Sequence, residues 1–462
     1  MDYLAIRGAC VVLAIVSLAP LALYLVGRVR DPFHPLALAG LLAFGIADFK
    51  LLLDPGSALN YVEAGSLVEF ELIAAASLLC LYLGWHWRGW RRPAGRLRGA
   101  VAGSPPRAYS PSRLLGTGGL MALLALTAWL VDIHRVRATG YVADWVFLQT
   151  PAAVLLIQAG LLDRNLWLPA LTALCLDLFG CAYHAYTYGS RSTTAILFTV
   201  LAVPFFVRGA RPRKKWVLVA GAVGFIVMMT LAETRTIVGK GEAPNRFAAL
   251  WVAGERFIHG GQRRYGAGRE FVVGAGEVQV VQDQQNWNFG RVFPDMAIIF
   301  LPHQYFPDKY DWVSPWDAPH FFPLLRRYLG LTKKVLSYGV APTGFADAYV
   351  NFWWMFPLFW LALGYFLNFI YAEAVYGHRL DHQCYLVCSF LVLFLLVGQD
   401  IEAGEFAALF TMLPAWLAYG YAAEHNPHPG LALHADSQGL GRRYGSRTAE
   451  ISSDRPPSGG RQ

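Results

Sequence analysis

The chain of 462 residues is 55% hydrophobic and only 15% charged, with a formal net charge of +8, whereas soluble domains carry about 25% charged residues. This composition excludes an ordinary water-soluble enzyme and a disordered chain. The six cysteines all lie in apolar segments, which argues against a secreted disulfide-rich scaffold.

Apolar stretches that approach or exceed the length needed to cross a bilayer recur along the chain. Because lipid offers no partner to an unpaired backbone group, each stretch is expected to form a helix. The predicted fold is therefore all-α, a polytopic transmembrane helical bundle of about 11 spans. The apolar runs lie at about 8–26, 35–53, 67–87, 114–133, 145–162, 166–184, 193–207, 216–232, 352–371, 384–398 and 406–423.

Lys and Arg in the connections predict the orientation, because cytoplasmic connections are enriched in both. One set of connections carries 21 of these residues and the alternate short connections carry 4. We therefore expect the N-terminus outside and the C-terminus in the cytoplasm. The run that follows Arg7 lacks a clear cleavage pattern and is interpreted as a first span, with a cleaved signal peptide as the alternative.

Four regions follow from this layout. The first eight spans form a membrane bundle over 1–232, and a long external loop, periplasmic in a Gram-negative cell, covers 233–351. The last three spans occupy 352–423. The tail at 424–462 is rich in Gly, Ser, Arg and Pro and is predicted to be disordered. We find no internal repeat typical of an inverted-repeat transporter.

A short external turn reads YTYGSRSTT at 186–194. Gly189 permits a tight turn, and Ser190 and Ser192 suit the cap of the next helix. Arg191 would lie beside the free N–H groups and the positive end of that helix, an arrangement that favours an anion. A turn that only caps the helix is the alternative.

The external loop mixes arginines with aromatic residues, as in NWNFGRVFP and QYFPDKYDWVSPWDAPHFFP. Aromatic rings and guanidinium groups together suit a sugar linked to an anion. Anchoring of the rings at the membrane interface is the alternative. The helical spacing of Phe247, Leu250, Trp251 and Ile258 predicts an amphipathic interfacial helix, either a phosphate-binding element or a support.

Polar residues also precede the ninth run, in SYGVAPTGFADAYVNF. A polar helix start on the outer face suits phosphate or hydroxyl groups, and Asp347 would act there as a base or as a helix cap. Ionisable residues inside the spans are few. Asp177 lies within the sixth run, and Lys50 is expected to pair with Glu69 or Glu71.

The layout and these motifs resemble the bacterial O-antigen and exopolysaccharide repeat-unit polymerases. The resemblance rests on about eleven spans, the GSR turn, the long late external loop, the PTGFADAYVNF start of the next span, and LPHQYFPDKYDW at 301–312. The last stretch is similar to a Pro-aromatic-Pro-Lys segment of the family. It departs from the family in having His303 after Pro302 where an arginine is expected.

The resemblance implies a glycosyltransferase of the bacterial inner membrane that moves a glycan from undecaprenyl diphosphate to a new lipid-linked repeat unit. Arginines near the outer leaflet would stabilise the leaving diphosphate, and a carboxylate or histidine would serve as base, with no metal or other cofactor. The predicted bases are His303, Asp347 and Glu255. The predicted substrate-binding residues are Arg191, Arg235, Arg246, Arg256, Arg291 and Lys309.

The expected partners are a lipid-linked oligosaccharide donor and acceptor, membrane lipids and a chain-length regulator, but no nucleic acid. An O-antigen ligase-type transferase is the nearest alternative, because it uses the same donor with another acceptor. A transporter or flippase of lipid-linked saccharide, or a structural partner in polysaccharide export, belongs to a different class. The scarcity of charge in the spans and the long external loop argue against a transporter.

Overall fold

The computed structural model describes residues 2–26, 34–45, 49–87, 108–133, 145–188, 191–207, 219, 223, 234, 237–238, 241–258, 270–299, 301, 305–314, 321–329, 343–375, 377 and 379–423. Within these ranges the chain is helical, and its single β pairing is an isolated bridge between Tyr109 and Ala423. Eight helices of this part are long and apolar enough to cross a membrane. The chain is a multi-pass membrane protein, as predicted.

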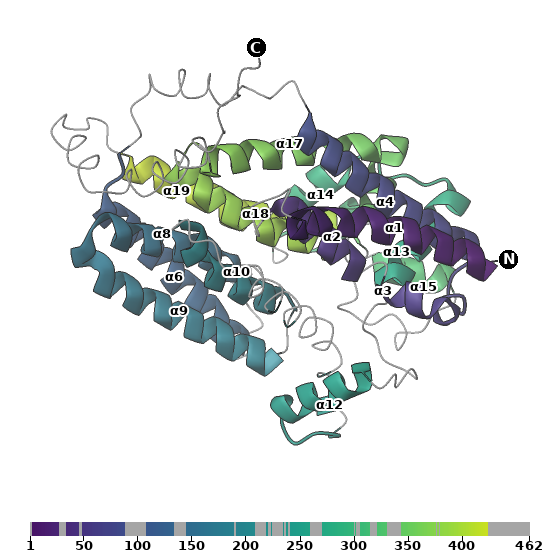
Figure 1. Ribbon diagram of the computed structural model, residues 1–462, viewed down its shortest axis with the longest axis horizontal. Helices are drawn as coiled ribbons and strands as arrows, with labels where there is room; N and C mark the ends of the chain where they lie inside the picture. Colours follow the sequence, from purple (N-terminus) through teal and green to yellow (C-terminus); the bar gives the residue numbers. More distant parts are fainter. Residues whose placement is uncertain are drawn as a thin grey trace, which may run out of the picture.

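Long helices form two groups that α18 and α19 connect (Figure 1). Helices α1, α2, α4 and α17 pack in the first group, and α6, α8, α9 and α10 pack in the second. The bounds are α1 (Asp2–Leu25), α2 (Pro35–Ala43), α4 (Ala64–His86), α6 (Pro111–Ile133), α8 (Gln149–Leu162), α9 (Trp167–Tyr188), α10 (Arg191–Val207), α17 (Phe356–Val375), α18 (Leu380–Gly398) and α19 (Ile401–Ala422).

Shorter helices fill the connections and the insertion at 233–351. The α-helices among them are α3 (Phe49–Leu53), α12 (Arg246–Ile258), α13 (Glu270–Gln284), α14 (Val292–Ile299), α15 (Phe321–Tyr328) and α16 (Gly344–Phe352). The 3₁₀ helices are η2 (Pro55–Ser57), η4 (Trp145–Leu148), η5 (Arg164–Leu166), η6 (Lys309–Trp312) and η7 (Trp353–Met355).

Three predicted spans differ from the others in the structure. The run at 35–53 contributes α2 and α3, and residues 46–48 between them lie outside the described part. The run at 193–207 forms α10, which has 17 residues. The run at 216–232 lies outside the described residues except for positions 219 and 223. The all-α membrane bundle is therefore confirmed, and the number of spans stays a prediction.

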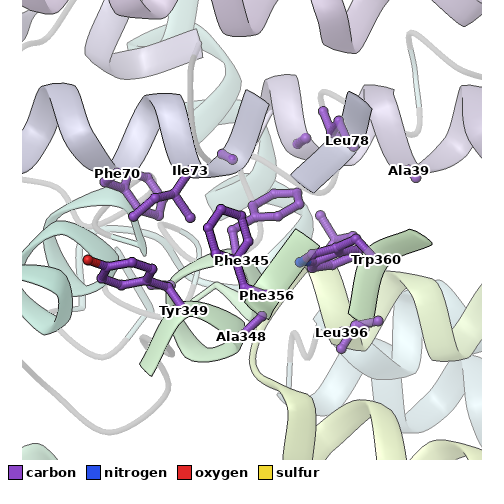
Figure 2. Close-up of a cluster of buried hydrophobic side chains, with 14 of the residues drawn as sticks. Ala39, Phe70, Ile73, Leu78, Phe345, Ala348, Tyr349, Phe356, Trp360 and Leu396 are labelled. Carbon is purple, nitrogen blue, oxygen red and sulfur yellow. The ribbon is translucent and has the colours of Figure 1, made fainter. Parts of the chain in front are cut away.

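Close contact between α4 and α17 holds the first group together. A Cβ atom on Gly84 would lie 2.0 Å from the Leu361 carbonyl oxygen, and one on Gly364 would lie 2.0 Å from the Leu81 carbonyl oxygen. Glycines at these two positions let the backbones approach, which is how small residues support helix packing in membranes. Figure 2 shows the core beside this contact, where Phe345 and Trp360 pack with Leu78.

Two helices of the predicted external loop belong to this same core. Helix α13 packs on α4, α15 and α16, with Gly274 against the ring of Phe70. Residues Gly344–Asn351 of α16 are all buried. Figure 1 shows α13 and α15 at the end of the bundle where α1 begins, and we call this end the insertion end. Helices α13, α15 and α16 therefore complete the bundle, whereas α12 lies apart from it (Figure 1).

Candidate functional site

Polar side chains from three helices meet at the insertion end. Gln282 of α13 donates its amide N–H groups to Oε1 of Glu69 on α4 and, at 3.1 Å, to the hydroxyl oxygen of Tyr349 on α16. The Tyr349 hydroxyl also lies 3.4 Å from Glu69 Oε1 and donates to it. We call these three residues, together with Trp287, the insertion-end site.

The Glu69 carboxylate is only half-buried. Among the described residues, both hydrogen bonds to it reach Oε1, which leaves Oε2 open to a further donor. Side-chain donors that hold one carboxylate oxygen fix its orientation while the other oxygen stays free. Such a carboxylate can accept a hydrogen bond, or a proton, from a ligand hydroxyl.

Indole rings pack around Tyr349, whose hydroxyl contacts this carboxylate. Trp287 packs edge-on against Tyr349, with ring centroids 4.9 Å apart, and Trp353 lies 5.8 Å from Trp287. Trp354 lies 6.1 Å from Tyr349 on another side and is 64% exposed. Exposed aromatic surface next to a carboxylate and an amide is the combination that binds a sugar, because the ring covers its C–H face while polar groups hold its hydroxyls.

Reversals of the backbone bring the indole rings to Tyr349. Gln285 follows α13 with a φ of 52°, Phe289 has a φ of 48°, and Trp353 has a φ of 49° after α16. A left-handed conformation in residues other than glycine costs energy and is retained only where the surroundings impose it. Here it turns the chain back so that Trp287 reaches Tyr349.

A buried hydrogen-bond network stabilises these backbone reversals. Asn288 donates its backbone N–H to the Val350 carbonyl at 3.1 Å and its side-chain amide to Asn351 Oδ1 at 2.8 Å. Asn351 donates in turn to Asp347 Oδ1 at 2.8 Å. Asp347 Oδ2 accepts the backbone N–H of Ile401 at 2.7 Å. The network joins the segment after α13 to α16 and α19.

Asp347 therefore caps a helix, but not its own. Thr343 occupies the N-cap position of α16, and the Asp347 carboxylate lies at the start of α19. There it works beside Asp400, which accepts the Ala403 N–H at 2.6 Å. Two carboxylates at a helix N-terminus complement its positive end. With each oxygen of Asp347 holding a donor, the geometry favours a positioning role over that of a base.

Two titratable groups near this end have shifted pKa values. The hydrogen bond from the Tyr328 hydroxyl to Asp283 Oδ2, at 2.5 Å, raises the pKa of Tyr328. Burial raises the pKa of Asp400 to about 6, although the N–H of Ala403 acts in the opposite direction. Asp283 and Tyr328 lie on the exposed rim of the insertion-end site.

Of the predicted substrate-binding residues, Arg291 lies closest in the chain to this site, four positions after Trp287. Its side chain is 53% exposed, donates to the Trp312 carbonyl at 3.0 Å and lies 3.6 Å from Asp295. Lys309 has the opposite environment, because it is buried and donates Nζ–H to the Leu301 carbonyl at 2.6 Å. Its ammonium group has further N–H donors, so burial rather than this bond separates Lys309 from a substrate.

Of the remaining predicted residues, only the side chain of Glu255 is described. The predicted amphipathic helix is confirmed as α12, which Figure 1 shows apart from the bundle, and Glu255 is exposed on it. Arg246 and Arg256 belong to α12 and Arg191 begins α10, but their side chains lie outside the described part. Arg235 and His303 also lie outside the described residues.

Glu69, Gln282 and Trp287 are the residues that sequence reasoning did not assign to a site. Glu69 was expected to pair with Lys50, whose side chain lies outside the described part, and Trp287 was noticed only within the aromatic stretch NWNF. Gln282 and Glu69 are 213 positions apart, so no local pattern indicates their contact.

Within the described ranges, no three His, Cys, Asp or Glu side chains are grouped to hold a metal ion. No protein-family model matches the chain, and neither curated proteins nor solved structures include a significant match to it.

Proposed function

We propose that this protein polymerises lipid-diphosphate-linked oligosaccharide repeat units, such as those on undecaprenyl diphosphate, into O-antigen or exopolysaccharide at the outer face of the bacterial inner membrane. The observation that carries the proposal is the insertion-end site, where an oriented carboxylate with a free oxygen lies beside several exposed indole rings. The Lys and Arg asymmetry of the connections predicts that this end faces outside, which supports the proposal.

In the proposed reaction, a hydroxyl of the acceptor sugar attacks the anomeric carbon of the donor. The new glycosidic bond forms as the bond from that carbon to the diphosphate oxygen breaks, and the hydroxyl proton passes to Glu69 Oε2. Gln282 and Tyr349 hold the carboxylate through Oε1. General-base assistance of this kind contributes about 10²–10⁴ in rate.

The leaving diphosphate requires positive charge where its own charge develops. Arg291 is the described candidate, because it is half-exposed on the segment that carries Trp287. Arg191, Arg235, Arg246 and Arg256 remain proposed contacts from the sequence. The trans-membrane bundle would hold the polyprenyl chain in the lipid while the two saccharides meet at the insertion end.

The direct test is reconstitution of the purified protein with a synthetic lipid-linked repeat unit, with and without chelator, followed by product sizing. Wild type is expected to give ladders longer than two units. Glu69→Gln, which keeps the shape of the side chain, is expected to lower kcat by about 100-fold or more. Asp308→Asn, at an exposed carboxylate of the insertion, is the matched control and should keep wild-type rates.

Full-length ladders from folded Glu69→Gln would remove Glu69 from the mechanism. Tyr349→Phe, which deletes only the hydroxyl, provides a second test if Glu69→Gln fails to fold, and its kcat should fall with KM little changed. Transfer only to a lipid A core or protein acceptor would instead identify a ligase-type transferase. Transbilayer movement of the repeat unit without bond formation would identify a flippase.

A further inference from the structure

Asp177 is a buried acid that the proposed glycosyl transfer does not use. It lies midway along α9, a span of 22 residues, and its exposed fraction is only 1%. Among the described residues, neither carboxylate oxygen has a hydrogen-bond partner. An ionisable residue inside a membrane span usually marks a functional site, because burial without a partner is expensive.

Further oxygen atoms without partners come from the adjoining start of α8. Gln149 donates its side-chain N–H to the backbone carbonyl of Asp177 at 3.0 Å, so its amide lies beside this turn of α9. Gln149 Oε1 and Thr150 Oγ1 are both buried and, within the described residues, accept no hydrogen bond. Cys181, one turn after Asp177 on α9, donates its thiol to the Thr193 carbonyl at 3.5 Å.

The position of α8 makes this arrangement unusual. Helix α8 begins at Gln149, yet this residue contacts the middle of α9 rather than its end. The short 3₁₀ helix η4 precedes it. The two form one continuous span over Trp145–Leu162 that changes from 3₁₀ to α-helix beside the acid, and such a change inside a helix often marks a functional position.

The dipole of a helix does not offset the free-energy cost of burying the ionised Asp177 carboxylate. A helix N-terminus stabilises a nearby anion by up to about 2 kcal/mol in a partly buried geometry. The effective penalty for burying one ion is several kcal/mol. At this depth the acid is therefore stable when it is protonated or when a bound cation neutralises it.

We propose that Asp177, Gln149 and Thr150 form a binding site for one monovalent metal cation, with Na⁺ as the probe ion. Carboxylate, amide and hydroxyl oxygens are the ligands that hard cations take. One carboxylate balances one positive charge, whereas a divalent ion would leave a net charge buried in the bundle. The site belongs to the α8–α9 pair, and the inference does not depend on the glycosyl transfer.

The test measures thermal unfolding of the purified full-length protein in NaCl, KCl, LiCl and MgCl2, each against choline chloride at equal ionic strength. A cation that binds the folded state alone raises Tm with its concentration until the site saturates. We expect Na⁺ to raise Tm by about 2 °C or more at saturation. Binding of ²²Na⁺ should reach one ion per chain.

Asp177→Asn should abolish the Na⁺-dependent rise and, in choline, should be at least as stable as wild type because no charge is left buried. Asp163→Asn, at an exposed end of α8, is the matched control and should keep the rise. If Asp177→Asn does not fold, Gln149→Leu should raise the Na⁺ concentration needed for half-saturation by at least tenfold.

Three results would overturn the proposal. Equal Tm values in choline and in every metal chloride would show that the protein itself neutralises Asp177. A rise with MgCl2 alone would exclude a monovalent site. A full Na⁺-dependent rise in Asp177→Asn or Gln149→Leu would place the ion elsewhere.

Discussion

Replacement of Asp347 by alanine is expected to destabilise the insertion end by about 3 kcal/mol. The Ile401 N–H, on a residue only 1% exposed, would lose its acceptor at 2.7 Å, which costs about 1–3 kcal/mol. Asn351 would lose one further bond worth about 1 kcal/mol, while it still donates to the Asp347 carbonyl at 3.0 Å. Asp347→Asn should cost less, about 2 kcal/mol, because the amide oxygen still accepts one of the two donors.

The assay is SDS titration in mixed micelles, followed by tryptophan fluorescence. The double variant Asp347→Ala with Asn351→Ala should cost clearly less than the sum of the single variants, because residues that share a hydrogen bond are coupled. Asp308→Ala, at an exposed site, should change stability by less than about 0.5 kcal/mol. A change that small in Asp347→Ala would refute the view that its carboxylate holds α19 to α16.

Packing and pH give further predictions. Gly84→Ala should lower the free energy of unfolding by about 2 kcal/mol or more, because its Cβ would meet the Leu361 backbone at 2.0 Å. In the control variant Gly119→Ala in α6, the added Cβ meets no atom within 4 Å, so this change should be neutral or stabilising. Equal unfolding midpoints for the two variants would contradict the close packing. Burial raises the pKa of Asp400 from its ordinary value of 3.8 to about 6, so ionisation costs more in the folded state and stability should fall as pH rises from about 4 to 6. In Asp400→Asn this decrease in stability should disappear, as measured by unfolding midpoints across that pH range. An unchanged pH profile in the variant would show that another group causes the decrease.

The sequence by itself determined the class of protein. Scarce charge and repeated apolar runs require helices in a membrane, because only helices satisfy their own backbone groups in lipid, and eight such helices are present in the described part. Local signals were also sufficient for α12, from its amphipathic spacing, and for a new helix at the GSR motif, where α10 begins at Arg191. Each of these depends on residues that are neighbours along one segment.

Tertiary structure alone decided which polar groups meet. Asp347 at the first turn of a helix indicates a base or a cap, but the helix it caps is α19, which begins 54 positions later. Glu69 joins Gln282 and Tyr349 because α13, despite its place in the insertion, packs into the bundle. Asp177 was visible as a buried acid, but its neighbour Gln149 followed only from the packing of α8 against α9. Periodicity reports the face that a segment buries, whereas contacts between distant segments depend on how the helices pack against one another.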